Sequence, residues 1–212
     1  MIAKEGSVFI AAALVISLAL SVILGGYGVP ALILPLYVAY FFRDPRRFIP
    51  TGKNLILSPA DGRILSVDEQ EEGRYLKRKM KKVSLFMSPF DVHINRIPCS
   101  GRIKQVFYNH GKYLAAFKEK ASLDNEQNAV LMETDRGSEI LFVQIAGWLA
   151  RRIVCYLKGG EQVTRGERYG LIRFGSRIDL YLPLDVEILV SVGERAKGGE
   201  TIIGRFLMKE AL

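Results

Sequence analysis

The chain divides into an apolar N-terminal segment and a longer segment in which apolar and polar residues alternate. Between Gly6 and Phe42 the sequence has no charged residue. The run Gly25-Gly-Tyr-Gly-Val-Pro30 interrupts this stretch and leaves two apolar pieces, Val8–Leu24 and Ala31–Phe42. Because glycine and proline disfavour helix interiors, the pattern predicts two helices. Only the first is long enough to cross a hydrocarbon core of about 30 Å.

We expect residues 1–42 to anchor the chain to the cell membrane. Lys4 precedes the apolar run and Arg43, Arg46 and Arg47 follow it. This placement favours a helical hairpin with both ends on the cytoplasmic side. One span followed by a re-entrant or interfacial stretch stays open. A cleaved secretory signal is the main competitor, but the run is too long for one and no small-x-small cleavage site precedes the arginines.

From Leu55 onward, short alternating segments separated by glycine turns predict strands. The candidates are Ile56–Leu57, Arg63–Val67, Lys82–Met87, Gly101–Val106, Asn128–Glu133, Glu139–Ile145, Ile153–Tyr156, Arg168–Phe174, Ile178–Leu182 and Asp185–Val192. This spacing predicts a mainly β fold with minor α, a barrel or sandwich. The turn Gly160–Glu167 is echoed by Gly193–Glu200, a form found in barrel-sandwich proteins. Ala146–Cys155 is compatible with a short helix, and the basic run Lys77–Lys82 predicts a solvated hairpin or loop, with a lipid-headgroup contact as the alternative.

Composition narrows the classes of partner. A length of 212 residues suits one domain with an appendage. The formal net charge of +8 favours an anionic partner, either nucleic acid or an acidic membrane surface. Cys99 and Cys155 have neither metal-like nor CxxC spacing, so we expect buried thiols in a reducing compartment and no metal site.

Three motifs carry candidate chemistry. They are Ser58-Pro-Ala-Asp61-Gly, Ser88-Pro-Phe-Asp-Val-His93-Ile-Asn and Phe174-Gly-Ser-Arg177. The last lies inside an alternating strand pattern, Leu171–Pro183, where neither glycine nor serine is favoured. A serine hydroxyl next to an uncovered glycine carbonyl is what an attack of the chain on its own backbone requires. The motifs together suggest a serine that cuts the chain.

Collinear stretches over nearly the whole chain after the apolar segment resemble phosphatidylserine decarboxylase proenzymes, in particular the short microbial form. They are Phe41–Pro45, Ser58–Arg63, Met87–Arg96, Lys120–Asn128, Val143–Gly147, Ala150–Cys155 and Gly170–Arg177. The resemblance implies that residues 43–212 form the catalytic domain. It also implies cleavage between Gly175 and Ser176 into a large chain, 1–175, and a small chain of 212 − 175 = 37 residues, 176–212.

In that chemistry the Ser176 hydroxyl attacks the Gly175 carbonyl carbon and forms an ester. β-Elimination then leaves dehydroalanine at position 176, and its hydrolysis with loss of ammonia gives a pyruvoyl group. This group is the implied cofactor, covalent and derived from Ser176. It forms a Schiff base with the amine of a serine phospholipid and accepts electrons as carbon dioxide leaves. The implied product is phosphatidylethanolamine. Diacyl and archaeal ether lipids share this headgroup chemistry, so the sequence does not choose between them.

The resemblance also assigns supporting roles. Asp61 is expected to orient the base that activates Ser176, although Asp-Gly is also a common turn pair. His93 suits proton transfer near neutral pH, although a lone histidine in an apolar strand is often a core residue. Longer family members carry a second histidine where this chain has Arg96, so one histidine can serve both cleavage and decarboxylation, or another group takes over one role. His110 is expected in a loop.

Other polar residues have no assigned role. Asn125, Glu126 and Asn128 are expected either to line the site or to form an exposed loop. Arg96, Arg151, Arg152 and Arg177 are candidate ligands of the substrate phosphate or carboxylate.

Two alternative functions stay open from the residues alone. One is a membrane-anchored Ser/His/Asp hydrolase with an intact chain, although the sequence has no G-x-S-x-G elbow around Ser176. The other is a non-catalytic lipid-binding barrel. The expected partners are the membrane and a serine phospholipid, without nucleic acid, and association with further copies of the chain stays open.

Overall fold

The computed structural model of the protein describes residues 1–111, 125–147, 152–173 and 176–207. Contacts between Cα atoms divide the chain into two compact units, Met1–Arg46 and Arg47–Leu212. Three predicted positions, Gly175, Arg151 and the stretch 120–124, lie outside the described residues.

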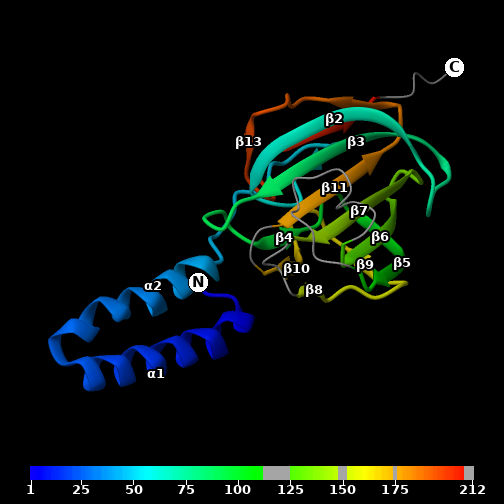
Figure 1. Cartoon of the computed structure of the whole chain (residues 1–212). Helices are drawn as coiled ribbons and strands as arrows, with labels where there is room; N and C mark the ends of the chain where they lie inside the picture. Colours follow the sequence, from blue (N-terminus) through cyan, green and yellow to red (C-terminus); the bar gives the residue numbers. More distant parts are fainter. Residues whose placement is uncertain (112–124, 148–151, 174–175, 208–212) are drawn as a thin grey trace, which may run out of the picture. The chain divides into compact units, whose positions relative to one another are not determined.

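The first unit is a pair of antiparallel helices (Figure 1). It consists of a short 3₁₀ turn, Lys4–Gly6, then α1, Ser7–Leu24, a second 3₁₀ segment, Gly25–Leu32, and α2, Ile33–Phe41. Backbone hydrogen bonds join its two ends, from Ala3 N to Phe42 O at 2.8 Å and from Asp44 N to Met1 O at 2.7 Å. The predicted helical hairpin is confirmed, and both of its ends lie at the same end of the helix pair.

Close contacts hold α1 against the 3₁₀ segment Gly25–Leu32. Ser17 Oγ donates to Ala31 O at 2.7 Å, and Ser21 Oγ donates to Gly28 O at 3.2 Å. A Cβ atom at Gly28 would lie only 2.4 Å from Ser21 Cα, so this approach requires glycine. Among the described residues, the helical stretch Lys4–Leu24 is long and apolar enough to cross a membrane, whereas Pro30–Phe41 is shorter.

The second unit is built from antiparallel strands in three sheets (Figure 1). Its strands are β1 (Leu55–Leu57), β2 (Gly62–Glu72), β3 (Arg78–Met87), β4 (Ile94–Arg96), β5 (Gly101–Asn109), β6 (Gln127–Thr134), β7 (Glu139–Ala146), β8 (Ile153–Cys155), β9 (Gln162–Val163), β10 (Arg168–Ile172), β11 (Ser176–Leu182), β12 (Val186–Ile188), β13 (Arg195–Ala196) and β14 (Ile202–Phe206). The large, curled sheet has the order β13-β2-β3-β11-β7-β6-β5-β9, and the small sheets have the orders β4-β10-β8 and β1-β14-β12. The mainly β prediction is confirmed.

The two faces of the large sheet differ in chemistry. On β11, Ile178, Leu180 and Leu182 are fully buried in the hydrophobic core. Arg177 and Asp179 alternate with them and therefore lie on the opposite face, because successive strand residues point to opposite sides. We call the face that carries Ile178 and Leu180 the inner face.

One local prediction about the reactive motif was wrong, because Ser176 does not lie in mid-strand. The strand candidates Arg168–Phe174 and Ile178–Leu182 correspond to two strands in different sheets, β10, which ends at Ile172, and β11, which begins at Ser176. The basic run Lys77–Lys82 belongs to the hairpin of β2 and β3, in agreement with the expected hairpin or loop. Its charges pair with the neighbouring strand, as Lys79 does with Glu69 at 2.9 Å.

Candidate functional site

Ser176 is the first residue of β11, which is a central strand of the large sheet. Its neighbours across the two adjacent strands are Met87 at the end of β3 and Ala146 at the end of β7. Its side chain is fully buried, and its hydroxyl donates to Met87 Sδ at 3.3 Å. Met87 and Ala146 belong to a small apolar cluster on the inner face, which also contains Ala60, Ile153, Ile172 and Ile178. The predicted nucleophile thus occupies a site with little access for water.

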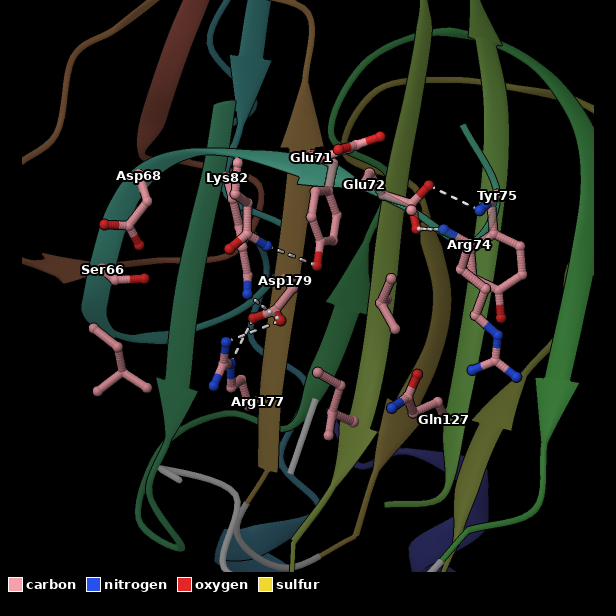
Figure 2. Close-up of a pocket in the computed structure, with 16 residues that line it drawn as sticks. Ser66, Asp68, Glu71, Glu72, Arg74, Tyr75, Lys82, Gln127, Arg177 and Asp179 are labelled. Atoms are coloured by element: carbon pink, nitrogen blue, oxygen red, sulfur yellow. Dashed lines mark hydrogen bonds and ion pairs between the residues drawn. The ribbon is translucent and has the colours of Figure 1, made fainter. Parts of the chain in front are cut away.

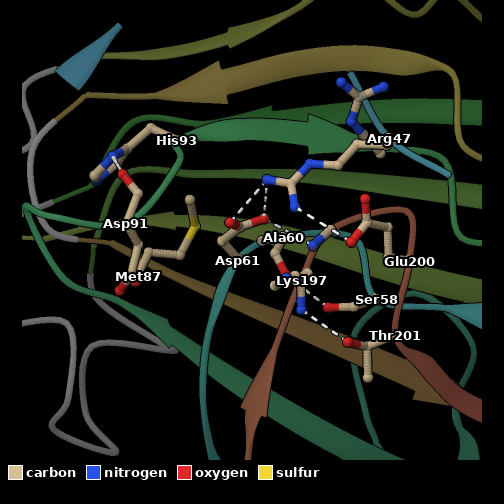
Figure 3. A network of polar contacts seen from close by, with 12 residues as sticks. Arg47, Ser58, Ala60, Asp61, Met87, Asp91, His93, Lys197, Glu200 and Thr201 are labelled. Carbon is tan, nitrogen blue, oxygen red and sulfur yellow. Dashed lines mark hydrogen bonds and ion pairs between the residues drawn. The ribbon is translucent and has the colours of Figure 1, made fainter. Parts of the chain in front are cut away.

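His93 follows the turn that leaves β3 at Met87. The Asp91 carboxylate holds this turn, accepting hydrogen bonds from Ser88 N at 2.8 Å and Ser88 Oγ at 2.7 Å. The ring of His93 is buried, and its Nδ1 lies 3.0 Å from Asp91 O (Figure 3). A carbonyl oxygen only accepts, so this contact places the proton on Nδ1. In the neutral ring Nε2 then has the lone pair and is the basic atom.

Asp61 is engaged by a different partner from the one expected. Its two carboxylate oxygens both accept from Arg47 Nη2 at 2.8 Å, and Oδ1 also accepts from Gly198 N at 2.8 Å (Figure 3). The Arg47 side chain is only 6% exposed, so the pair is largely shielded from water. Among the described residues, the Asp61 carboxylate bonds to Arg47 and Gly198 rather than to His93. Its orienting role stays a prediction.

A row of buried amides joins the large sheet to β4 beside Ser176. Asn95 Nδ2 lies 3.8 Å from Met87 Sδ, and Gln144 Nε2 donates to Asn95 Oδ1 at 2.8 Å. Asn128 Nδ2 in turn donates to Gln144 Oε1 at 2.9 Å. All three amides are at most 2% exposed. Buried polar groups that satisfy one another fix side-chain positions, so this row holds the thioether of Met87 against Ser176.

Sequence reasoning missed Gln144 and Asn95, although one pattern pointed to Gln144. Along β7, Ile140, Phe142, Gln144 and Ala146 share one face, and Gln144 is the polar residue among three buried apolar ones. A polar residue at a core-facing position of a strand requires a partner. Asn95 lies on β4, a strand of three residues that the sequence did not reveal.

Glu126 also belongs to this region. It is 3% exposed, and its Oε1 accepts from Tyr108 Oη and from Ile153 N at 3.5 Å. Asn125 is equally buried and donates from Nδ2 to Ala146 O at 2.7 Å. The expectation that Asn125, Glu126 and Asn128 line the site is therefore favoured over an exposed loop. His110 lies nearby on the surface, with its ring edge-on to Tyr108 at 4.9 Å between centroids.

The three candidate arginines that the structure describes do not converge on Ser176. Arg177 lies on the opposite face, where its guanidinium binds both oxygens of Asp179 at 2.5 and 3.0 Å (Figure 2). The guanidinium also donates to Ser84 Oγ at 3.0 Å. Lys82 reaches the Asp179 carboxylate at 3.3 Å. The side chains of Lys82, Arg177 and Asp179 lie in the wall of a cavity of about 630 Å³. Arg96 donates to Gly166 O at 3.0 Å, and Arg152 is exposed.

Both cysteines are free thiols, and one of them is buried. Cys99 is the buried one, and Cys155 is partly buried. Burial raises the pKa of the Cys99 thiol to about 12, so it stays protonated at neutral pH. No group of three or more His, Cys, Asp or Glu side chains that could hold a metal ion occurs within the described parts of the chain.

Comparison with known proteins identifies the family. Residues 34–204 match the family model described as phosphatidylserine decarboxylase. A phosphatidylserine decarboxylase proenzyme of Rickettsia akari (strain Hartford) is 48% identical over 213 residues, which cover 99% of this chain and 92% of that protein. The proenzyme of Geotalea uraniireducens (strain Rf4) is 48% identical over 206 residues, covering 96% and 95%. The chain therefore belongs to the phosphatidylserine decarboxylase family.

Proposed function

We propose that the chain is the proenzyme of a decarboxylase that converts phosphatidylserine to phosphatidylethanolamine and carbon dioxide. In this proposal the chain first cleaves itself between Gly175 and Ser176, and residue 176 becomes a pyruvoyl group. One observation carries the proposal beyond family membership. Ser176 is fully buried at the start of a central strand, beside the turn that carries His93. Burying a serine hydroxyl away from water is unfavourable, so a function in cleavage would explain a serine at this position.

Cleavage requires a base, because a serine hydroxyl is a weak nucleophile. We assign this role to His93, whose Nδ1 is occupied by Asp91 O and whose Nε2 is the basic atom. The Ser176 hydroxyl donates to Met87 in the proenzyme, so it must turn from the thioether toward the base before it attacks. Contacts of catalytic groups are often longer before reaction than during it. Asp61 would support the site through Arg47 and Gly198.

The residues around position 176 fit a pyruvoyl group. Such a group stays attached to β11, so the pairing with Met87 and Ala146 would hold it in place. The apolar cluster of Ala60, Ile153 and their neighbours would keep water from competing. The group supplies a ketone that withdraws electrons from the headgroup as carbon dioxide leaves. His93 is placed to move the proton that the product requires.

We propose that the first unit attaches the enzyme to the cell membrane, with the second unit in the cytoplasm. Its helix α1 exposes large apolar side chains along its length, among them Val8, Val15 and Val22. Such a surface is unfavourable in water and favourable in a bilayer. Because phosphatidylserine is itself a bilayer component, an anchored enzyme would meet its substrate in the membrane.

Intact-mass analysis under denaturing conditions tests the proposal. We expect the wild-type chain to give fragments 1–175 and 176–212, the smaller lighter than its unmodified sequence and without a free amine. Ser176→Ala should stay whole. Ser84→Ala is the matched control, since Ser84 is a buried serine on the neighbouring strand and should cleave normally. An active chain that remains unbroken, with a serine that reacts with fluorophosphonates, would support the hydrolase instead.

A further inference from the structure

Glu126 lies in one row with Ser176 across the large sheet. Ala146 pairs with Ser176 on one side, and on the other side its N–H donates to the Glu126 carbonyl at 3.0 Å. Residues that face one another across antiparallel strands point to the same side. Glu126 contacts Ile153 N of β8, and Ser176 contacts Met87, which belongs with Ile153 to the same apolar cluster. Both side chains therefore lie on the inner face.

The distance between the two residues is short enough for shared chemistry. Neighbouring strands lie about 4.8 Å apart, so two strand spacings separate the backbones of Glu126 and Ser176 by about 10 Å. The residue between them is Ala146, whose side chain is a single methyl group. A glutamate side chain extended along the row therefore covers much of that distance above a small neighbour.

The Glu126 carboxylate has one oxygen in use and one available. Its Oε1 accepts from Tyr108 and Ile153, whereas Oε2 is buried and has no hydrogen-bond partner within the described part of the chain. Burial removes this oxygen from water, and without a partner it lowers the stability of the fold. A function in the reaction would explain why a carboxylate occupies the position. Glu126 thus presents a lone pair, shielded from solvent, in the row of the residue that reacts.

Three other buried or half-buried carboxylates of the second unit have both oxygens or their charge satisfied by other partners. Asp61 binds Arg47, and Asp179 binds Arg177 and Lys82. Both oxygens of Glu72 accept from backbone N–H groups, those of Arg74, Tyr75 and Leu76. By comparison, Glu126 combines burial, an available oxygen and a place beside Ser176.

We propose that Glu126 is a further catalytic residue, the base that removes the α-proton of residue 176 during self-cleavage. The inference rests on the proposed cleavage between Gly175 and Ser176. After the attack, the Gly175 acyl group is an ester on Ser176 Oγ, and the amine of residue 176 is free. Glu126 takes the proton from Cα, the C–H electron pair forms the Cα=Cβ bond, and the Cβ–Oγ bond breaks. Gly175 leaves as a carboxylate, so atoms and charge balance without another reactant.

This role separates two steps that one histidine would otherwise have to serve. His93 acts on the hydroxyl before the ester forms, and Glu126 acts on the carbon after it has formed. A histidine held by Asp91 in the turn after β3 and a carboxylate beside β7 approach residue 176 from different strands. The separation also offers an answer to the missing second histidine, since Arg96, which occupies that position, is always protonated and cannot be a base.

The test is Glu126→Gln, which keeps size and an acceptor for Tyr108 but removes the base. We expect the ester to form and then accumulate, because cleavage at 175/176 should slow by about 10²-fold or more. Hydroxylamine breaks an ester. It should therefore release fragment 1–175 as a hydroxamate together with a small fragment that retains intact Ser176 and a free amine. Intact mass distinguishes this small fragment from the pyruvoyl form of the wild type.

Glu72→Gln is the matched control, since it makes the same change in a buried carboxylate whose oxygens are all engaged, and it should cleave at the wild-type rate. If Glu126→Gln does not fold, Glu126→Asp carries the test and should accumulate the same ester to a smaller extent. Cleavage of the folded variant at the wild-type rate would overturn the inference, as would loss of cleavage without ester. A wild-type chain that never cleaves at 175/176 would instead refute the proposed function.

Discussion

Ser176 donates its hydroxyl hydrogen to the thioether sulfur of Met87, the residue directly opposite it on β3, at 3.3 Å. A thioether is a weak acceptor and takes no proton at neutral pH, so this contact holds the hydroxyl without activating it. Met87 is itself held, because Asn95 contacts the same sulfur and Gln144 fixes Asn95. The proenzyme therefore keeps its nucleophile in a defined but inactive orientation.

We expect Met87→Leu to speed self-cleavage severalfold while leaving the fold intact. Leucine is similar in volume, so the cost in unfolding free energy should be under about 1.5 kcal/mol. It offers no acceptor, so the Ser176 hydroxyl is no longer held in the inactive orientation and can turn toward His93. The measurement is the rate of appearance of the small fragment after synthesis. Met80→Leu is the control, since Met80 is equally buried near the other end of β3. Equal rates for both variants would show that the sulfur has no role.

The pairing of Asp61 with Arg47 predicts a large effect on stability. Asp61→Asn leaves the nearly buried Arg47 guanidinium with only the more distant Glu200 carboxylate, at 3.9 Å, and breaking a pair costs about 3–5 kcal/mol when both groups are buried. Because Asp61 is 15% exposed on its side chain, we expect about 2–4 kcal/mol, measured by urea unfolding of the Ser176→Ala background.

Arg47→Met separates the two possible roles of Asp61. If Asp61 supports the site through Arg47, cleavage should fall in both variants. If Asp61 instead orients His93 directly, only Asp61→Asn should impair cleavage. Arg205→Met provides the reference for an exposed pair, with Glu187, and should change the free energy of unfolding far less than a variant of the buried pair.

Much of the fold could be predicted from the sequence, because alternation and glycine turns are local signals. The cores of β2, β3, β5, β6 and β7 were all found in this way. The short strands β4 and β13 show no period and were missed, whereas β1 and β8, which have three residues each, were expected at Ile56–Leu57 and Ile153–Tyr156. The division of Leu171–Pro183 between two sheets was also invisible, since each half alternates correctly on its own.

The site was only partly predictable, for a different reason. Short motifs pointed to Ser176, His93 and Asp61, whose roles stay predictions, because unusual residue types stand close together within each motif. Their partners come from distant segments, as Arg47 does for Asp61 and Met87 does for Ser176. Only the sheet register reveals such pairs. The same holds for Arg177, which is adjacent to Ser176 in sequence but faces the other side of the sheet.

The buried thiol of Cys99 predicts a loss of stability at high pH. Burial raises its pKa to about 12 in the native state, whereas an exposed cysteine has a pKa of about 8.5. The stability that the protonated, buried thiol contributes is fully present at pH values below the pKa of the exposed cysteine. Between about pH 9 and about pH 12 the unfolded chain binds fewer protons, so the free energy of unfolding falls, by up to about 1.4 kcal/mol per pH unit.

Cys99→Ala should remove this part of the pH dependence. Urea unfolding at several pH values above 8 gives the slope of the free energy of unfolding against pH for the wild type and for the variant. Only the difference between the two slopes reports on the thiol, because other groups titrate in the same range. Burial also raises the pKa of Tyr181, for example. Parallel curves for the wild type and the variant would contradict the prediction.

Asp179 is the counter-charge of two buried cations, and its removal should be among the most destabilising single changes in the second unit. Both Arg177 and Lys82 bind it, and their side chains are only 5% and 9% exposed. Asp179→Asn leaves two positive charges in the sheet without compensation, which should cost about 3–5 kcal/mol in urea unfolding. Glu187→Gln, which breaks an exposed pair with Arg205, should cost under about 1 kcal/mol. Lys82→Met combined with Asp179→Asn should recover part of the loss, because one uncompensated charge is removed.

Where Asp179→Asn folds, it should still cleave between 175 and 176, since the cluster of Arg177, Asp179 and Lys82 lies on the face opposite the Ser176 hydroxyl. A stable Asp179→Asn variant that cannot cleave would instead place Arg177 in the reaction.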